Sequence, residues 1–109
     1  MPEEDRYELL EDFTVLCDVE GACYTITVPS GFLYDGASIP PPGWILGYTP
    51  HHPDMMLPAL VHDYLYTTRE VDRLTADSIF YELLIQNGVK KPIAEVMFQA
   101  VRACGGGHW

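Results

Sequence analysis

Between Met55 and Tyr66 the chain contains one ionisable pair besides its tyrosines, and that pair is His62-Asp63. Its neighbours in sequence are apolar or aromatic, and a helix that is apolar on most sides is usually buried. Burying an imidazole and a carboxylate is costly unless they are paired or bound to a metal. Two interpretations stay open: a catalytic or metal-binding site, as is common for buried ionisable groups, or a structural polar cluster that joins two helices.

The expected partner of His62 is Asp77, which lies on a second predicted helix with Phe80 and Leu84. Asp77 precedes these two residues by three and seven positions, so it lies on or beside their inward-facing stripe. If the two helices run antiparallel, Asp77 can face His62, fix its tautomer and leave the other ring nitrogen as a general base. The alternative is a surface pair with Arg73 at i,i+4, and both contacts are compatible because a carboxylate has two oxygens.

A third feature is the segment from Asp35 to Ser38, which follows the strand region and precedes a proline-rich stretch. Asp35 can add a metal ligand or a hydrogen bond to the His62-Asp63 site, or it can form a turn. We expect Ser38 to cap that turn, because no nucleophile-elbow motif surrounds it. The adjacent histidines His51-His52 are a weaker candidate metal site, because they lack the usual ligand spacing.

Hydrophobic patterning predicts the elements that must position these residues. The first half of the chain is rich in β-branched and aromatic residues and alternates as strands do, whereas the second half has helical spacing. Proline suits the first position of a helix, and proline-rich residues 35–53 are expected to be irregular. The expected elements are strands at Phe13–Val19 and Ala22–Val28 with a turn at Glu20-Gly21, a short extended piece at Phe32–Tyr34, and helices at about Pro58–Thr67, Asp72–Gln86 and Pro92–Cys104, with Leu74 and Val96 facing inward.

These elements predict one α+β domain that covers residues 1–109, with a small N-terminal antiparallel hairpin or sheet packed on about three C-terminal helices. The site is expected where the loop containing Asp35 meets the helices that contain His62-Asp63 and Asp77.

The amino-acid composition limits the classes of molecule that the protein is expected to bind. Asp and Glu outnumber Lys and Arg by 16 to 6, for a net charge of −10, which disfavours nucleic acid and suits solubility, a bound cation or a basic partner. No segment contains the roughly 20 apolar residues of a membrane span, and the acidic N-terminus is unlike a signal peptide. The three cysteines have irregular spacing, which indicates reduced thiols of a cytosolic protein rather than a disulfide framework.

Several motifs occur in a fixed order: residues 28–32 and 34–40 fit "P-x-G-F-x-T-D-x-A-S-x-P", 60–66 fit "HD-x-L-Y", Arg73 with 76–80 fits "R-x-x-A-D-x-x-F", and 101–105 fit "V-R-x-x-G". In this order and spacing the chain resembles a family of phage and prophage proteins known as domain of unknown function 1353 (DUF1353). The resemblance runs from about Val28 to the end of the chain. It departs from the family pattern at Tyr34, where the family commonly has Thr.

A looser resemblance concerns the helix pair alone. An "H-D-x-x-Y" helix followed by an antiparallel "A-D-x-x-F" helix is similar to phospholipases of the A(2) type. That resemblance implies that His62 is the general base that activates water, that Asp63 binds calcium, and that Asp77 orients His62. Those enzymes have a glycine-rich calcium loop just before the histidine, and here only the segment beginning at Asp35 could replace it, by folding back.

The sequence therefore favours a small phage-encoded hydrolase, assisted by a divalent cation with calcium as the first candidate, in which His62 is the base. One alternative is a non-enzymatic phage accessory or virion-assembly protein whose His-Asp-Asp cluster is structural. Another is an inhibitor that binds a basic host protein through its acidic surface. The expected location is the host cytoplasm, or the virion if the protein assembles into one.

Overall fold

The computed structural model describes residues 7–34 and 53–104. It has the α+β architecture expected from the sequence, with two small antiparallel sheets followed by three helices. The elements are β1 (Tyr7–Glu8), β2 (Phe13–Val19), β3 (Ala22–Val28), β4 (Leu33–Tyr34), α2 (Pro53–Thr68), α3 (Arg73–Gln86) and α4 (Lys91–Cys104). None of these helices is long and apolar enough to cross a membrane.

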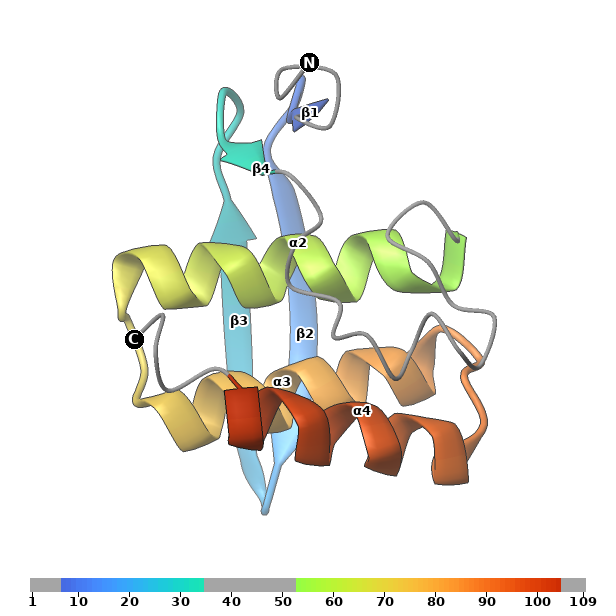
Figure 1. The fold of residues 1–109 in the computed structure, drawn as a ribbon. Helices are drawn as coiled ribbons and strands as arrows, with labels where there is room; N and C mark the ends of the chain where they lie inside the picture. Colours follow the sequence, from blue (N-terminus) through green and yellow to red (C-terminus); the bar gives the residue numbers. More distant parts are fainter. Residues whose placement is uncertain (1–6, 35–52, 105–109) are drawn as a thin grey trace.

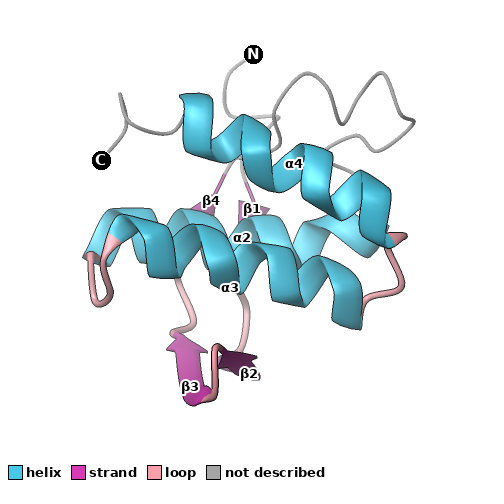
Figure 2. Cartoon of the chain, turned by 90° about the horizontal axis from the view of Figure 1, so that it is seen from below, coloured by secondary structure: helices cyan, strands magenta, loops and turns pink. Residues whose placement is uncertain are grey.

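The elements form three layers (Figures 1 and 2). The β2–β3 hairpin lies under α2 and α3, which run antiparallel to each other, and α4 packs on α3 on the side away from the hairpin. The short strands β1 and β4 pair with each other at one end of the hairpin. The central helix α3 therefore contacts both the hairpin and α4.

The hairpin forms because the backbone geometry of its turn is compatible with the alternation of buried and exposed side chains along its strands. Glu20 and Gly21 both have positive φ, at 51° and 84°, as a tight turn between twisted strands requires. Alternate residues of both strands then face the helices, with Cys17, Ile26 and Val28 buried in one core cluster. The predicted strand bounds are confirmed at both ends.

The two core clusters meet on opposite faces of α3. One face, with Ala76, Ile79 and Leu83, packs against α2 and the hairpin. The other face, with Phe80 and Leu84, packs against α4 and the first half of α2. A helix that is covered on both faces needs apolar side chains around most of its circumference, and α3 has them.

Two details of the helices differ from expectation. The first helix begins at Pro53, so Pro58 lies inside it and is fully buried; burial of the ring offsets the one backbone hydrogen bond that proline removes. Leu74 and Val96 were expected to face inward but are 53% and 44% exposed. Leu74 on α3 and Val96 on α4 lie outside the faces by which these helices pack. The prediction from helical spacing that both side chains face inward is therefore wrong.

Candidate functional site

His62 and Asp77 form a buried pair between α2 and α3. Because these helices run side by side and antiparallel, the two side chains meet, and the Nε2 atom of His62 lies 2.7 Å from Oδ1 of Asp77. The side chains are 4% and 0% exposed. The burial of His62 and its contact with Asp77, both expected from the sequence, are confirmed.

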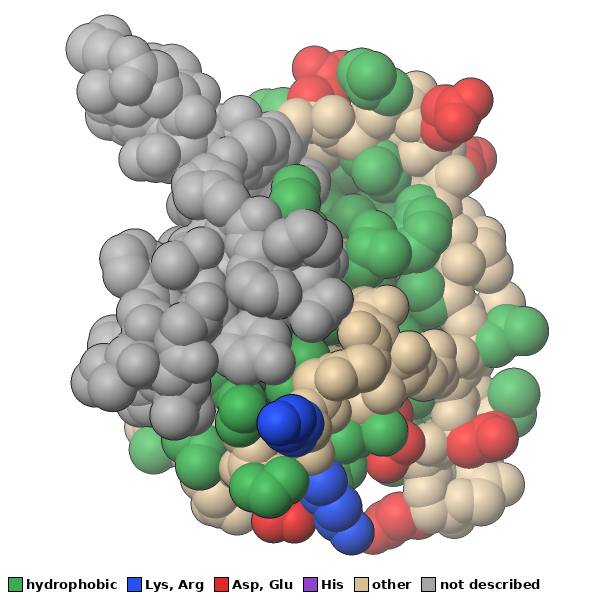
Figure 3. All heavy atoms as spheres, turned by 90° about the vertical axis from the view of Figure 1, so that its right-hand side faces the viewer, with side chains coloured by type: hydrophobic (Ala, Val, Ile, Leu, Met, Phe, Trp, Pro, Cys, Tyr) green, Lys and Arg blue, Asp and Glu red, His purple; other side chains and the backbone are tan. Residues whose placement is uncertain are grey.

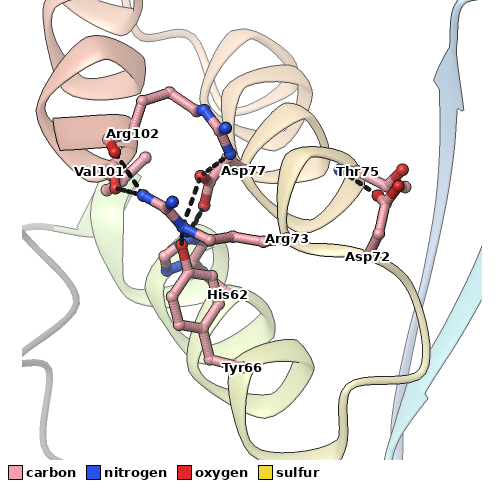
Figure 4. Close-up of polar contacts among 8 residues, drawn as sticks. All are labelled: His62, Tyr66, Asp72, Arg73, Thr75, Asp77, Val101 and Arg102. Atoms are coloured by element: carbon pink, nitrogen blue, oxygen red, sulfur yellow. Dashed lines mark hydrogen bonds and ion pairs between the residues drawn. The ribbon is translucent and has the colours of Figure 1, made fainter. Parts of the chain in front are cut away.

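Two further groups bind the Asp77 carboxylate (Figure 4). The Tyr66 hydroxyl donates to Oδ1 at 2.6 Å, and the Arg102 Nη1 atom donates to Oδ2 at 2.9 Å. Sequence reasoning assigned neither contact. Tyr66 follows His62 by four residues and so shares its helix face, a local signal that was available; Arg102 is 25 residues from Asp77, and nothing local connects the two.

Arg73 also belongs to this cluster, and its i,i+4 pair with Asp77, left open by the sequence, occurs together with the His62 contact. Its Nε atom lies 4.0 Å from Oδ2 of Asp77, at the outer limit of an ion pair, and donates to the Tyr66 hydroxyl at 3.3 Å. Its Nη2 atom donates to the backbone carbonyls of Val101 and Arg102. Cations are favourable at the C-terminal end of a helix, so Arg73 stabilises the last turn of α4 and thereby holds Arg102 next to Asp77.

The electrostatics keep Asp77 ionised. Burial acts to raise the pKa of Asp77, but hydrogen bonds from His62, Tyr66 and Arg102 outweigh it and hold this pKa below the ordinary 3.8. Burial and the hydrogen bond to Asp77 raise the pKa of Tyr66 to about 12. At neutral pH the carboxylate is therefore the acceptor and the phenol remains a donor.

The arrangement leaves one polar atom of His62 without a partner. A carboxylate at Oδ1 accepts a hydrogen from Nε2, so a neutral imidazole has its lone pair at Nδ1. The Nδ1 atom is buried and has no hydrogen-bond partner among the described residues. The ring also contacts the rings of Tyr66 and Phe80, at centroid distances of 4.3 and 4.8 Å. A buried nitrogen with a free lone pair can accept a proton or a hydrogen bond, or bind a metal.

Asp63 lies apart from this pair. Its side chain is half-buried rather than mostly inaccessible as expected, because the next residue of a helix points about 100° away. The carbonyl oxygen of Asp63 accepts a hydrogen bond from the Thr67 hydroxyl. In the described ranges, no group of three or more His, Cys, Asp or Glu side chains could hold a metal. The other candidates, Asp35, Ser38 and His51-His52, lie outside the described residues.

The thiols of the hairpin lie apart from the cluster. Cys17 is buried, Cys23 is exposed, and both are free. Burial, followed by the nearby negative charges of Glu82 and Asp18, raises the pKa of Cys17 to about 11, so its thiol is not a nucleophile at neutral pH.

Comparison with known proteins places the chain in a family. Residues 7–101 match a family described as "Protein of unknown function (DUF1353)". No curated protein and no solved structure matches the chain.

Proposed function

The chain belongs to the DUF1353 family, and we propose that it is a small phage-encoded hydrolase in which His62 is the general base. The observation that supports this proposal is the Nδ1 atom of His62, which is buried and has no partner among the described residues, while Nε2 is fixed by Asp77. An unsatisfied buried polar atom is costly and rare in native proteins, and a catalytic role is one of the reasons for which such an atom is retained. We propose that the protein acts in the host cytoplasm.

In this proposal Nδ1 accepts a proton from a water molecule, and the resulting hydroxide attacks an ester or amide carbonyl of the substrate. Asp77 holds the ring through Nε2 and stabilises the imidazolium that forms. Tyr66 and Arg102 keep Asp77 in place by donating to its two oxygens. The proton on Nδ1 then passes to the leaving group.

A divalent cation is part of the proposal, with calcium as the first candidate. Asp63, with Asp35 as a second oxygen donor, would hold it, since hard cations prefer oxygen ligands. When bound, the cation would polarise the substrate carbonyl. Of these two carboxylates, Asp63 lies in the described ranges. The cation is therefore tested separately from the base.

One observation favours a second candidate, a structural cluster in a non-enzymatic phage protein. Asp77 on α3 binds Tyr66 on α2 and Arg102 on α4, so it connects all three helices. A buried carboxylate whose two oxygens both accept hydrogen bonds can serve stability alone. This candidate explains Asp77 but gives no role to the Nδ1 atom of His62.

The variant His62→Gln distinguishes the hydrolase from the structural candidate. The Gln amide can still donate to Asp77, so most of the structural contact is retained, whereas the basic nitrogen is lost. Wild-type and variant are compared by thermal melts and by turnover on phospholipid, peptidoglycan, peptide and simple ester substrates, with calcium present and absent.

The hydrolase proposal predicts turnover by the wild-type protein and a loss of at least about 100-fold in the variant, the usual contribution of a general base. Thr68→Val, which removes a hydroxyl from the exposed end of α2, is the control and should retain full turnover. Turnover that is unchanged in His62→Gln, or absent with every substrate class, would favour the structural candidate.

A further inference from the structure

The outer edge of β3 presents backbone groups that have no partner among the described residues. In an antiparallel pair, directly opposed residues alternate between those that exchange backbone hydrogen bonds and those that do not. Leu16 is opposite Thr25, and the carbonyl of Leu16 points away from β3, since it accepts a hydrogen bond from Gln86. Leu16 and Thr25 are therefore a non-bonded pair, and so are the pairs two residues away on each side.

It follows that the N–H and C=O groups of Cys23, Thr25 and Thr27 point away from β2. The side-chain contact of Thr27 with Thr14, at 2.9 Å between hydroxyl oxygens, agrees with this assignment, because side chains are closest in non-bonded pairs. The β2–β3 sheet has two strands (Figure 1). No backbone hydrogen bond joins these three residues to another part of the described chain.

This edge also lacks the features that normally block strand addition. Protected edge strands contain lysine, proline or a β-bulge, and β3 contains none of them between Ala22 and Val28. The opposite edge of the sheet differs, because Gln86 from the end of α3 covers the carbonyl of Leu16 on β2. Among the described residues, the outward groups of β3 are therefore uncovered, whereas the edge of β2 is covered by α3 at Leu16.

The described N-terminal segment that contains β3 has charged side chains of one sign. Residues 7–34 contain five carboxylates and no Lys or Arg, and all five side chains are exposed. Three of them surround β3: Glu20 in the turn before it, Asp18 opposite Cys23, and Asp12, which accepts the N–H of Ser30 just after the strand. Figure 3, which faces the β2 side of the molecule, shows Asp and Glu at both its upper and its lower end, and the coloured Lys and Arg side chains toward the lower end.

We propose that the outer edge of β3 is a docking site for an extended, basic segment of another protein, which pairs with β3 as a third strand. Backbone groups of Cys23, Thr25 and Thr27 supply the hydrogen bonds of such strand addition, and the surrounding carboxylates select lysine and arginine over acidic side chains. The edge shares no residue with the His62 cluster, so this inference is independent of the proposed hydrolase activity.

The test uses three synthetic peptides with the intact, reduced protein. One alternates lysine with valine, the second alternates glutamate with valine, and the third is the lysine peptide with a central proline that prevents strand pairing. Binding is followed by amide chemical shifts and by hydrogen exchange. We expect the lysine peptide alone to bind, to slow exchange at the amides of Cys23, Thr25 and Thr27, and to lose about tenfold in affinity in high salt.

Variants of the hairpin then test whether the peptide binds at the outer edge of β3. Thr25→Pro removes an outward N–H without removing a bond to β2, and it should weaken binding at least about tenfold, or about 1.4 kcal/mol. Thr25→Lys, a second variant in case the proline disturbs the hairpin, should weaken it by charge repulsion. Thr14→Pro, which removes an outward N–H from the other edge, is the matched control and should bind as the wild-type protein does.

Several results would overturn the inference. Binding of the glutamate peptide as tightly as the lysine peptide would exclude selection by charge. Equal binding by Thr25→Pro, Thr25→Lys and the wild-type protein, or shifts confined to the helices, would exclude the edge. Self-association abolished by Thr25→Lys would assign the edge to a second copy of this chain instead of a basic partner.

Discussion

Replacing Asp77 with Ala tests how much the buried cluster contributes to stability. The substitution removes the acceptor of hydrogen bonds from His62, Tyr66 and Arg102, at 2.7, 2.6 and 2.9 Å. Breaking a buried pair by removing one partner costs roughly 3–5 kcal/mol, because the other partner stays buried and unsatisfied. Here Arg102 is 31% exposed and can be hydrated, whereas both ring nitrogens of His62 would be buried without a partner among the described residues.

We therefore expect Asp77→Ala to lower the free energy of unfolding by about 3 kcal/mol at neutral pH, near the low end of that range. The control is Asp18→Ala. It removes an exposed carboxylate from β2 and should change the free energy by less than about 0.5 kcal/mol. Urea melts of the three proteins at pH 7 measure both effects, provided that the slopes of the transitions agree.

The pH dependence gives a second test of the same reasoning. The pKa of Asp77 is lowered in the folded protein from the ordinary 3.8, so its ionised form stabilises the fold. That contribution is complete above the unfolded pKa and is lost as the pH falls through the folded pKa. The difference between wild-type and Asp77→Ala should therefore be largest at neutral pH and shrink below about pH 4. Equal midpoints for Asp77→Ala and Asp18→Ala, or a difference that does not change with pH, would refute the reasoning.

Three further predictions concern Tyr66 in the cluster, the proposed cation at Asp63, and the two cysteines of the hairpin. Tyr66→Phe removes a donor to Asp77 and an acceptor of Arg73, and should lower the free energy of unfolding in urea by about 1–2 kcal/mol. If Asp63 helps to bind calcium, calcium should raise the melting temperature of the wild-type protein but not of Asp63→Asn; equal shifts would exclude Asp63 as a ligand. Cys23, which is exposed, should react with a thiol reagent in the native protein, whereas the buried Cys17 should be labelled only after unfolding, as peptide mass spectrometry can show.

The sequence by itself determined the local elements. Alternation and the Glu20-Gly21 turn predicted both strands of the hairpin, because the side-chain period of a strand and the positive φ of its turn are local properties. Helical spacing likewise predicted a helix at about Asp72–Gln86, and α3 has Asp72 as its N-cap and Asn87 as its C-cap. The pairing of His62 with Asp77 was also predictable, since two antiparallel helices leave few other groups that could satisfy a buried imidazole.

The tertiary structure decided which groups complete the cluster. Arg102 reaches Asp77 only because α4 packs on α3, and Arg73, besides its i,i+4 ion pair with Asp77, donates to the end of α4. Such contacts depend on how helices cross, and side-chain packing sets that crossing over the whole interface. Burial was decided in the same way: His62 and Asp63 are neighbours in sequence, but only His62 faces the core, because successive residues of a helix point in different directions.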